Sequence, residues 1–144
     1  MAIRNMASRQ DLLDRICREH GLLAVYLFGS RADEGLRLLR DAAVPAGGSD
    51  IDIGIVFRDT SWNPQVLSEL QVDFEDLFDP LRVDLVPLQR VDALFQFNAI
   101  DGHRVAATDP NQADRYELVV MSCAEELLPT QRRIEIERFG VSTT

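Results

Sequence analysis

The chain has 144 residues, of which 46% are hydrophobic and 27% charged, so it fits one domain over residues 1–144 whose core needs no disulfide bonds. Its 15 Lys and Arg against 24 Asp and Glu give a net charge of −9, which disfavours bulk nucleic acid because an acidic surface repels phosphate backbones. A single nucleotide, whose charge a metal ion can neutralise, and a basic protein partner are both compatible with this charge.

The N-terminal part of the chain predicts a helix followed by a buried strand. Ser8 and Asp11 resemble a helix-capping box with Asp in place of Glu or Gln, and Gly21 is a typical helix stop. Leu22–Phe28 is a continuous apolar run with aromatic and β-branched members. Such a run predicts a strand buried on both faces, and Gly29 begins the turn that ends it.

The stretch after this turn predicts less regular structure. The spacing within 32–42 fits a short helix, and 44–48 contains Pro and two Gly, which indicate a loop. Taken as one segment, 32–48 offers no core of its own. We therefore expect it to be the most mobile internal segment.

The rest of the chain alternates strands and helices. Ile51–Phe57, rich in Ile, predicts a second central strand, and Pro64 predicts a helix start, with Trp62 before it interpreted as a packing residue rather than a base stacker. The later elements are a strand at 82–88, a helix at 91–99, a strand at His103–Ala107, a helix at 111–128 capped by Asp109 and ended by Pro129, and a helical segment at 130–139. This order predicts an α/β or α+β fold, with a small mixed sheet flanked by helices.

Cysteine spacing and apolar runs bear on the compartment. Cys17 and Cys123 lie far apart without a disulfide or zinc pattern, so both are interpreted as buried thiols. The longest apolar run, Leu22–Phe28, is too short to cross a bilayer, and residues 1–10 contain no apolar signal segment. We expect a cytoplasmic protein with no membrane partner.

The turn after the first strand is a candidate phosphate-binding site. Gly29 lets the backbone approach a ligand closely, and the following N–H groups and the Ser30 hydroxyl can hold phosphate oxygens. The alternative is an ordinary turn, which is the usual role of a Gly-Ser pair after a strand.

Paired aspartates at the second strand form a candidate metal site. Asp50 and Asp52 alternate with Ile residues, so both point to one face of the strand while the Ile side chains point to the other. Adjacent carboxylates repel each other, and Mg²⁺ relieves that repulsion because it takes hard oxygen ligands. The alternative for this pair is a solvated strand face.

A third aspartate belongs to the strand predicted at 82–88. Asp84 interrupts this apolar strand, with Val83 and Leu85 on the opposite face. If the strand lies beside Ile51–Phe57, Asp84 joins the other two carboxylates, and the cluster can bind two Mg²⁺ ions, or one metal ion with one carboxylate left to accept a proton. The alternative is an exposed residue at a strand end.

The sequence around these residues resembles a known enzyme superfamily. Leu-Phe-Gly-Ser-Arg-Ala at 27–32, Gly-Ser-Asp-Ile-Asp-Ile-Gly at 48–54 and Val-Asp-Leu-Val at 83–86 resemble the nucleotidyltransferases related to DNA polymerase β, and more closely the minimal nucleotidyltransferases of the MntA type. The similarity extends to a short strand near 100–105 and to a C-terminal helix that includes 114–117 and 124–129. The resemblance implies the polymerase β-like fold.

The resemblance implies an enzyme that acts as an antitoxin. Members of this type are paired with a HEPN-domain ribonuclease toxin and transfer AMP from ATP to a tyrosine of that toxin. The implied chemistry is in-line attack on the α-phosphorus with pyrophosphate leaving, assisted by Mg²⁺, with two ions expected. Asp50 and Asp52 would ligate the metal, and Asp84 would be the third carboxylate and help to activate the attacking hydroxyl.

The same resemblance assigns the nucleotide-binding residues and the partners. Gly29 and Ser30, together with Ser49, would hold the triphosphate. Arg31 would either contact a phosphate or organise the turn. The expected partners are ATP and the HEPN-type toxin, and a hetero-oligomer with the toxin is expected.

One departure from the family pattern concerns the connection between the two motifs. Ser30 and Asp50 are separated by 20 positions, which is longer than the family usually has. Asp33 and Glu34 bring negative charge near a triphosphate site. These acids would weaken ATP binding, or the long connection would shape partner recognition. Because the segment 32–48 joins the phosphate-binding turn to the metal-binding strand, we expect ATP with Mg²⁺ to order part of it.

Two other functions stay open at the level of sequence. An antitoxin with a weak or inactive site would neutralise its toxin by binding alone, and the acids after the Gly-Ser pair keep this alternative alive. A nucleotidyltransferase acting on a small molecule such as an aminoglycoside usually needs a second domain to hold the acceptor. The sequence leaves open the nucleotide preference, the acceptor residue and the oligomeric state.

Overall fold

The computed structural model describes residues 7–59 and 62–139, and its elements follow the predicted order. Three of the four strands have the bounds that the sequence predicts, and the third is shorter by one residue at each end. The elements are α1 (Arg9–His20), β1 (Leu22–Phe28), α2 (Ala32–Leu39), β2 (Ile51–Phe57), α3 (Pro64–Leu77), β3 (Val83–Pro87), the 3₁₀ helix η2 (Leu88–Arg90), α4 (Ala93–Ile100), β4 (His103–Ala107) and α5 (Pro110–Phe139).

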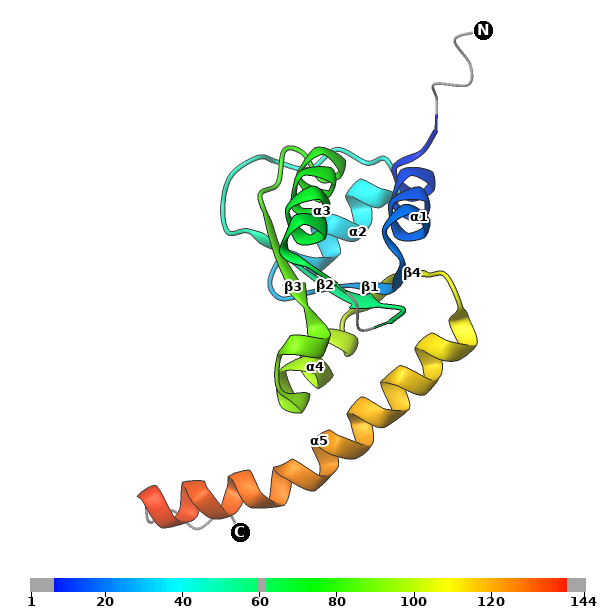
Figure 1. Ribbon diagram of the computed structural model, residues 1–144. Helices are drawn as coiled ribbons and strands as arrows, with labels where there is room; N and C mark the ends of the chain where they lie inside the picture. The colour runs from blue at the N-terminus through cyan, green and yellow to red at the C-terminus, as the bar shows by residue number, and fades with distance from the viewer. Residues whose placement is uncertain (1–6, 60–61, 140–144) are drawn as a thin grey trace, which may run out of the picture.

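The strands of the described residues form one mixed sheet in the order β3-β2-β1-β4 (Figure 1). β1 pairs antiparallel with both β2 and β4, whereas β2 pairs parallel with β3. The parallel pair is possible because α3 carries the chain from the end of β2 back to the start of β3. This confirms the predicted small mixed sheet flanked by helices.

Helices cover both faces of the sheet, and two apolar clusters result (Figure 1). α1, α2 and α3 pack on one face against Ile51, Ile53 and Ile55 of β2. η2, α4 and the start of α5 pack on the other face against Tyr26 and Phe28 of β1. All seven residues of β1 are buried, which confirms a strand covered on both sides.

The helix starts follow local capping rules. Ser8 and Asp11 form the predicted capping box of α1, in which each side chain accepts from the other residue's backbone N–H, and Gly21 ends the helix in the left-handed conformation. Asn63 caps α3 immediately before Pro64. These caps fix where each helix begins and therefore which faces it presents to the sheet.

The prediction that 32–48 has no core of its own is wrong for its first half. Residues 32–39 form α2, and Leu38 and Leu39 are buried in the cluster shared with α1 and α3. Gly35 lets this helix lie directly on β2, because a Cβ at this position would overlap the Ile51 side chain. Only the stretch after Asp41, up to β2, lacks regular structure.

The prediction that Pro129 ends a helix is also wrong. α5 is continuous from Pro110 to Phe139 and runs away from the body of the molecule (Figure 1). A proline inside a helix removes one backbone hydrogen bond. The good helix formers on both sides, Glu-Glu-Leu before it and Gln-Arg-Arg after it, favour continuation of the helix.

Two further expectations have different outcomes. Cys17 is buried as predicted, but Cys123 is exposed on α5, so the interpretation of two buried thiols is wrong for one of them. Cys123 is exposed although Val120 and Ala124, close to it on the same helix, are buried. Within residues 7–59 and 62–139, no helix combines the length and apolar character needed to span a membrane.

Candidate functional site

The pairing of β2 with β3 brings two of the three candidate carboxylates together. Asp52 and Asp84 are register partners in the parallel ladder, so their side chains lie on the same face of the sheet. On the other side of β2, Asp52 is the register partner of Phe28, the last residue of β1. The sequence could bring Asp84 to the other carboxylates only if its strand lay beside Ile51–Phe57. The structure shows that it does.

The surroundings of Asp52 shift the pKa of its carboxyl group. Burial raises the pKa of Asp52 above its ordinary value, and the charge of Asp84, a hydrogen bond between the two side chains and the charge of Asp50 act in the same direction. The folded chain therefore disfavours two negative charges at this position. A divalent cation between the carboxylates would reverse this effect, so the pair fits a metal such as Mg²⁺.

Asp50 lies just before β2, close enough for its charge to act on Asp52, but its carboxylate has a partner of its own. Its carboxylate forms an ion pair with Arg82, with 3.2 Å between Oδ1 and Nε, and both side chains are largely solvent-exposed. Within the part of the chain that the structure describes, no group of three or more His, Cys, Asp or Glu side chains is arranged to hold a metal ion. Metal binding by Asp50 requires its carboxylate to turn away from Arg82.

The Gly-Ser turn (Gly29 and Ser30) lies directly against the carboxylates. Gly29 has a φ of +77°, and a Cβ at this position would overlap the Asp52 carboxylate. Ser30 Oγ lies 3.2 Å from Ser49 Oγ, although the two residues are 19 positions apart. The predicted phosphate-binding residues and the metal-binding strand therefore meet at one end of the sheet.

Arg31 is buried rather than presented to a ligand. It has 7% of its surface exposed, and its guanidinium donates to the Glu34 carboxylate and to the backbone carbonyls of Pro45, Gly47 and Ser49. The hydrogen bond with Glu34 raises the pKa of Arg31 and lowers the pKa of Glu34. Of the two roles expected for Arg31, these contacts favour organisation of the turn.

The acids of α2 are partnered rather than free. Glu34 is paired with Arg31, with 2.7 Å between Oε2 and NH2. Asp33 Oδ1 lies 2.8 Å from Nε2 of His103, the first residue of β4. The charge of Glu34 is therefore opposed by Arg31, which weakens the expectation that this acid repels a triphosphate, whereas Asp33 has a hydrogen-bond partner but stays exposed. The Asp33–His103 contact spans 70 positions, and the sequence carries no signal of it.

An open hollow lies beside the Gly-Ser turn. It has a volume of about 460 Å³ and is lined by Ser30, Arg31, Glu34 and residues 45–49. Its lining combines two serines and two glycines with the Arg31–Glu34 pair and with Pro45 and Ala46. This composition suits phosphate oxygens better than an apolar ligand.

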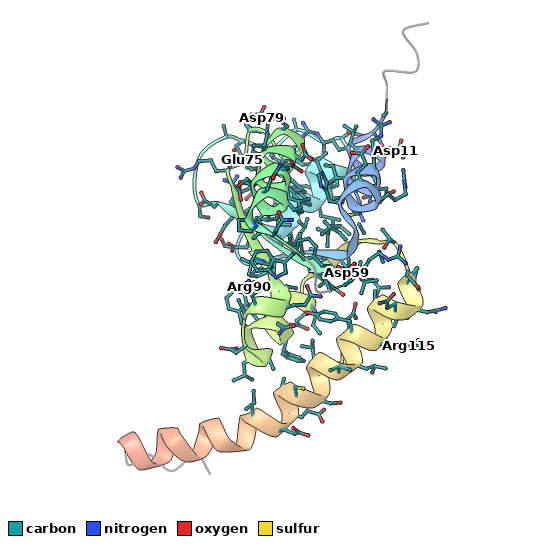
Figure 2. All side chains as sticks on the ribbon, in the orientation of Figure 1. Asp11, Asp59, Glu75, Asp79, Arg90 and Arg115 are labelled. Atoms are coloured by element: carbon teal, nitrogen blue, oxygen red, sulfur yellow. The ribbon has the colours of Figure 1, made fainter. Side chains whose placement is uncertain are left out.

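Two aromatic side chains have packing roles in the structure. Trp62 packs against the apolar cluster of α1–α3, and the Arg90 guanidinium lies over its ring, 4.1 Å from the centroid. Figure 2 labels Arg90 beside the start of α4. Phe95 of α4 packs edge-on against Phe28, with 5.8 Å between ring centroids. Because Phe28 is the register partner of Asp52, this aromatic pair lies next to the carboxylates.

Comparisons with known proteins agree with this geometry. A family model described as polymerase beta, nucleotidyltransferase matches residues 11–111, which include all the candidate site residues. No curated protein matches the chain at a significant level.

Solved structures share the fold at low sequence identity. A mutant of the toxin–antitoxin MntA–HpeT has a TM-score of 0.66 at 19% identity, covering 89% of this chain and 96% of that one. A toxin–antitoxin with AMP-PNP has a TM-score of 0.65 at 20% identity, covering 89% and 96%. A tri-AMPylated Shewanella oneidensis HEPN toxin in complex with MNT antitoxin has a TM-score of 0.63 at 19% identity, covering 90% and 94%.

Proposed function

Because the chain belongs to the polymerase β nucleotidyltransferase family, we propose that it is a Mg²⁺-dependent adenylyltransferase that transfers AMP from ATP to a tyrosine of a HEPN-type toxin, and so acts as an antitoxin. The observation that carries this proposal is the register pairing of Asp52 with Asp84 directly beside the Gly-Ser turn. A carboxylate pair next to a phosphate-binding turn is what metal-assisted nucleotidyl transfer requires.

In the proposed reaction, the tyrosine oxygen attacks the α-phosphorus of ATP, the bond from this phosphorus to the bridging oxygen breaks, and pyrophosphate leaves. The Gly-Ser turn and the Ser49 hydroxyl hold the phosphates. Asp84, more exposed than Asp52, accepts the proton of the attacking hydroxyl. Asp52 and Asp84, together with Asp50 once it turns from Arg82, would hold Mg²⁺, which would supply positive charge opposite the charge that develops on the phosphate oxygens.

The protein acceptor is supported by the solved structures that share the fold. One contains an AMPylated HEPN toxin with its antitoxin, and another contains an ATP analogue. The net charge of −9 also suits a protein partner of opposite charge better than a nucleic acid.

A second candidate is an antitoxin that neutralises its toxin by binding alone. The ion pair between Asp50 and Arg82 favours this alternative, because it occupies one of the three expected metal ligands. Arg82 is exposed in this pair, with 82% of its side-chain surface accessible, so the contact is weak and readily exchanged. We therefore favour the active enzyme.

The test is transfer in a purified system. The chain is incubated with ATP, Mg²⁺ and a HEPN-type protein encoded beside it, and the intact mass of that protein is measured. We expect a gain of one or more AMP groups on tyrosine, and no gain with Asp52→Asn. A stable complex without a mass gain would favour binding alone, and the absence of both would overturn the proposal.

A further inference from the structure

We infer that Arg31 is a positioning residue: together with Glu34 it fastens the segment 45–49 and thereby holds Ser49 and the start of β2 against the Gly-Ser turn. This role goes beyond the general assignment of the turn to ATP. Its effect on ATP rests on the proposed function, whereas the fastening itself rests on contacts within the chain.

The guanidinium of Arg31 is fully used by the protein. Nε and NH2 donate to the two carboxylate oxygens of Glu34 at 3.1 and 2.7 Å. NH2 also donates to the Pro45 carbonyl at 3.1 Å, and NH1 donates to the carbonyls of Gly47 and Ser49, the latter at 3.1 Å. A guanidinium has five N–H groups, and these contacts engage all of them, so none is left for a phosphate.

The segment that Arg31 fastens has little else to hold it. Between Asp41 and β2 the chain has no regular structure, and Gly47 and Gly48 adopt φ values of +86° and +82°. Glycines in such a stretch allow many backbone conformations, so ordering it is costly in entropy. The Ser30–Ser49 hydroxyl contact is exposed and is too weak to fix the segment by itself.

The segment 45–49 lies close to the Arg31 side chain at several of its residues. A Cβ at Gly48 would lie 3.2 Å from Arg31 NH1, so a larger residue would press on the guanidinium. The same segment leads through Ser49 to Asp50, and then to Asp52 within β2. By holding the backbone carbonyls of this segment, Arg31 therefore sets the position of the Ser49 hydroxyl, which is proposed to bind phosphate. It also sets the position of the first residue of β2, the strand that carries Asp52.

Glu34 distinguishes this role from direct phosphate binding. If Arg31 contacted the triphosphate, removal of the neighbouring acid would free the guanidinium and strengthen ATP binding, because one negative charge would be lost. If Arg31 holds the segment, removal of Glu34 loosens the guanidinium and weakens ATP binding. The two roles predict opposite signs for the same substitution.

The first measurement is Mg²⁺–ATP affinity by calorimetry for the whole chain. We expect Arg31→Ala and Glu34→Ala each to weaken binding by about tenfold, the scale of a lost charge-assisted hydrogen bond. Arg31→Lys should not restore affinity, because an ammonium with three donors cannot span a carboxylate and three carbonyls. Arg40→Ala, which removes an exposed arginine just after α2, is the matched control and should bind as the unmodified chain does.

The second measurement is hydrogen exchange without nucleotide. Peptides covering 42–50 should exchange at least about threefold faster in Arg31→Ala and Glu34→Ala, while β1 peptides stay unchanged. Tighter ATP binding by Glu34→Ala, or unchanged exchange at 42–50 in that variant, would overturn the inference. If the unmodified chain does not bind Mg²⁺–ATP, the proposed function fails, and the exchange measurement still decides whether Arg31 fastens the segment.

Discussion

Asp52 has opposite effects on folding and on the proposed chemistry. Its alternation with Ile51 and Ile53 follows from the strand and places it opposite the apolar face. The same placement puts it beside Asp84 and partly out of water, which raises its pKa. The residue is therefore unfavourable for the metal-free fold, although it is the central ligand of the proposed site.

We predict that Asp52→Asn abolishes AMP transfer and stabilises the metal-free chain. Loss of a metal ligand should reduce transfer by at least about 100-fold. Because the pKa is raised in the folded state, the charged form costs stability at neutral pH. That cost disappears as pH falls through the raised pKa to the ordinary value of 3.8, so the stability gain of the variant should be largest near pH 7.

Thermal melts with and without Mg²⁺ check this prediction. Mg²⁺ should raise the melting temperature of the unmodified chain and leave that of Asp52→Asn unchanged. Asp76→Asn, which changes an exposed acid of α3, is the control and should keep transfer and the Mg²⁺ response. A variant that melts lower than the unmodified chain without metal would contradict the account of the carboxylate pair.

The two thiols should differ strongly in reactivity. Burial, with a smaller contribution from Asp14, raises the pKa of Cys17 to about 12, so it stays a neutral thiol at pH 8. Cys123 is exposed on α5. A thiol reagent should therefore label one group quickly and the second only after denaturation, and Cys123→Ser should remove the fast phase. Two fast phases would place Cys17 at the surface.

Local sequence patterns singled out the three aspartates as candidates, but they did not decide between the two roles considered for Arg31. Alternation along two strands sufficed to put Asp50, Asp52 and Asp84 forward as candidates. Arg31 could not be assigned one role, because its carbonyl acceptors lie 14 to 18 positions further along the chain. A contact that depends on how a loop returns leaves no local pattern in the sequence.

At the scale of elements, a polar network fastens α5 to the sheet. Tyr26 Oη, on the buried strand β1, donates to Glu117 of α5 at 2.6 Å. Arg104 of β4 donates to Glu117 at 2.8 Å and to Asp114 at 2.7 Å. Figure 2 labels Arg115 on the same stretch of α5, outside this network and exposed. The network therefore lies on one side of the helix, facing the sheet.

We predict that Glu117→Ala lowers the free energy of unfolding by about 2 kcal/mol, because it leaves the buried Tyr26 hydroxyl without its acceptor. Tyr26→Phe removes the hydroxyl together with the need for a partner and should lower it by about 1 kcal/mol. Urea denaturation measures both, with Glu125→Ala on the exposed side of α5 as control. Equal stability of Glu117→Ala and the control would mean that the network contributes nothing.

Elements with strong local signals were predicted well, and those decided by packing were not. The strands Leu22–Phe28 and Ile51–Phe57 are confirmed at both ends, because predominantly apolar runs bounded by turn residues define strands. The short strand His103–Ala107, which is not an apolar run, is confirmed at both ends as well. The short helix expected within 32–42 is confirmed as α2, but its burial against β2, which Gly35 permits by a close approach, was not predicted. α5 continues through Pro129, although a proline inside a helix removes a hydrogen bond and clashes with the preceding turn at a cost of about 3 kcal/mol, so the usual helix-stop rule was wrong here.

At the scale of the whole molecule, the sheet order determines the site. β2 lies between β1 and β3, so the Gly-Ser turn at the end of β1 and Asp84 at the start of β3 flank Asp52 from both sides. Spacing along the chain predicted the strands but could not determine this order, because pairing between distant strands depends on the packing of all the helices. At the level of sequence, the neighbourhood of β2 and β3 was therefore only a condition, and the structure supplies the order.

The overall charge gives a prediction about assembly with the proposed toxin. A net charge of −9 produces a field that steers a basic partner toward the chain before contact. We expect the association rate constant to fall about tenfold or more as ionic strength rises from about 20 mM to about 300 mM, because the Debye length shortens from roughly 20 Å to below 10 Å. The dissociation rate constant should change much less, since short-range contacts set it.

Stopped-flow association at several salt concentrations measures this effect. The double variant Glu125→Gln with Glu126→Gln, which removes two exposed acids of α5, should lower the salt dependence without altering the fold. A change of the exposed Gln65 to Ala, on α3, leaves the charge unchanged and serves as control. An association rate constant independent of salt would show that the acidic surface does not guide the partner, and the charge would then act only in solubility.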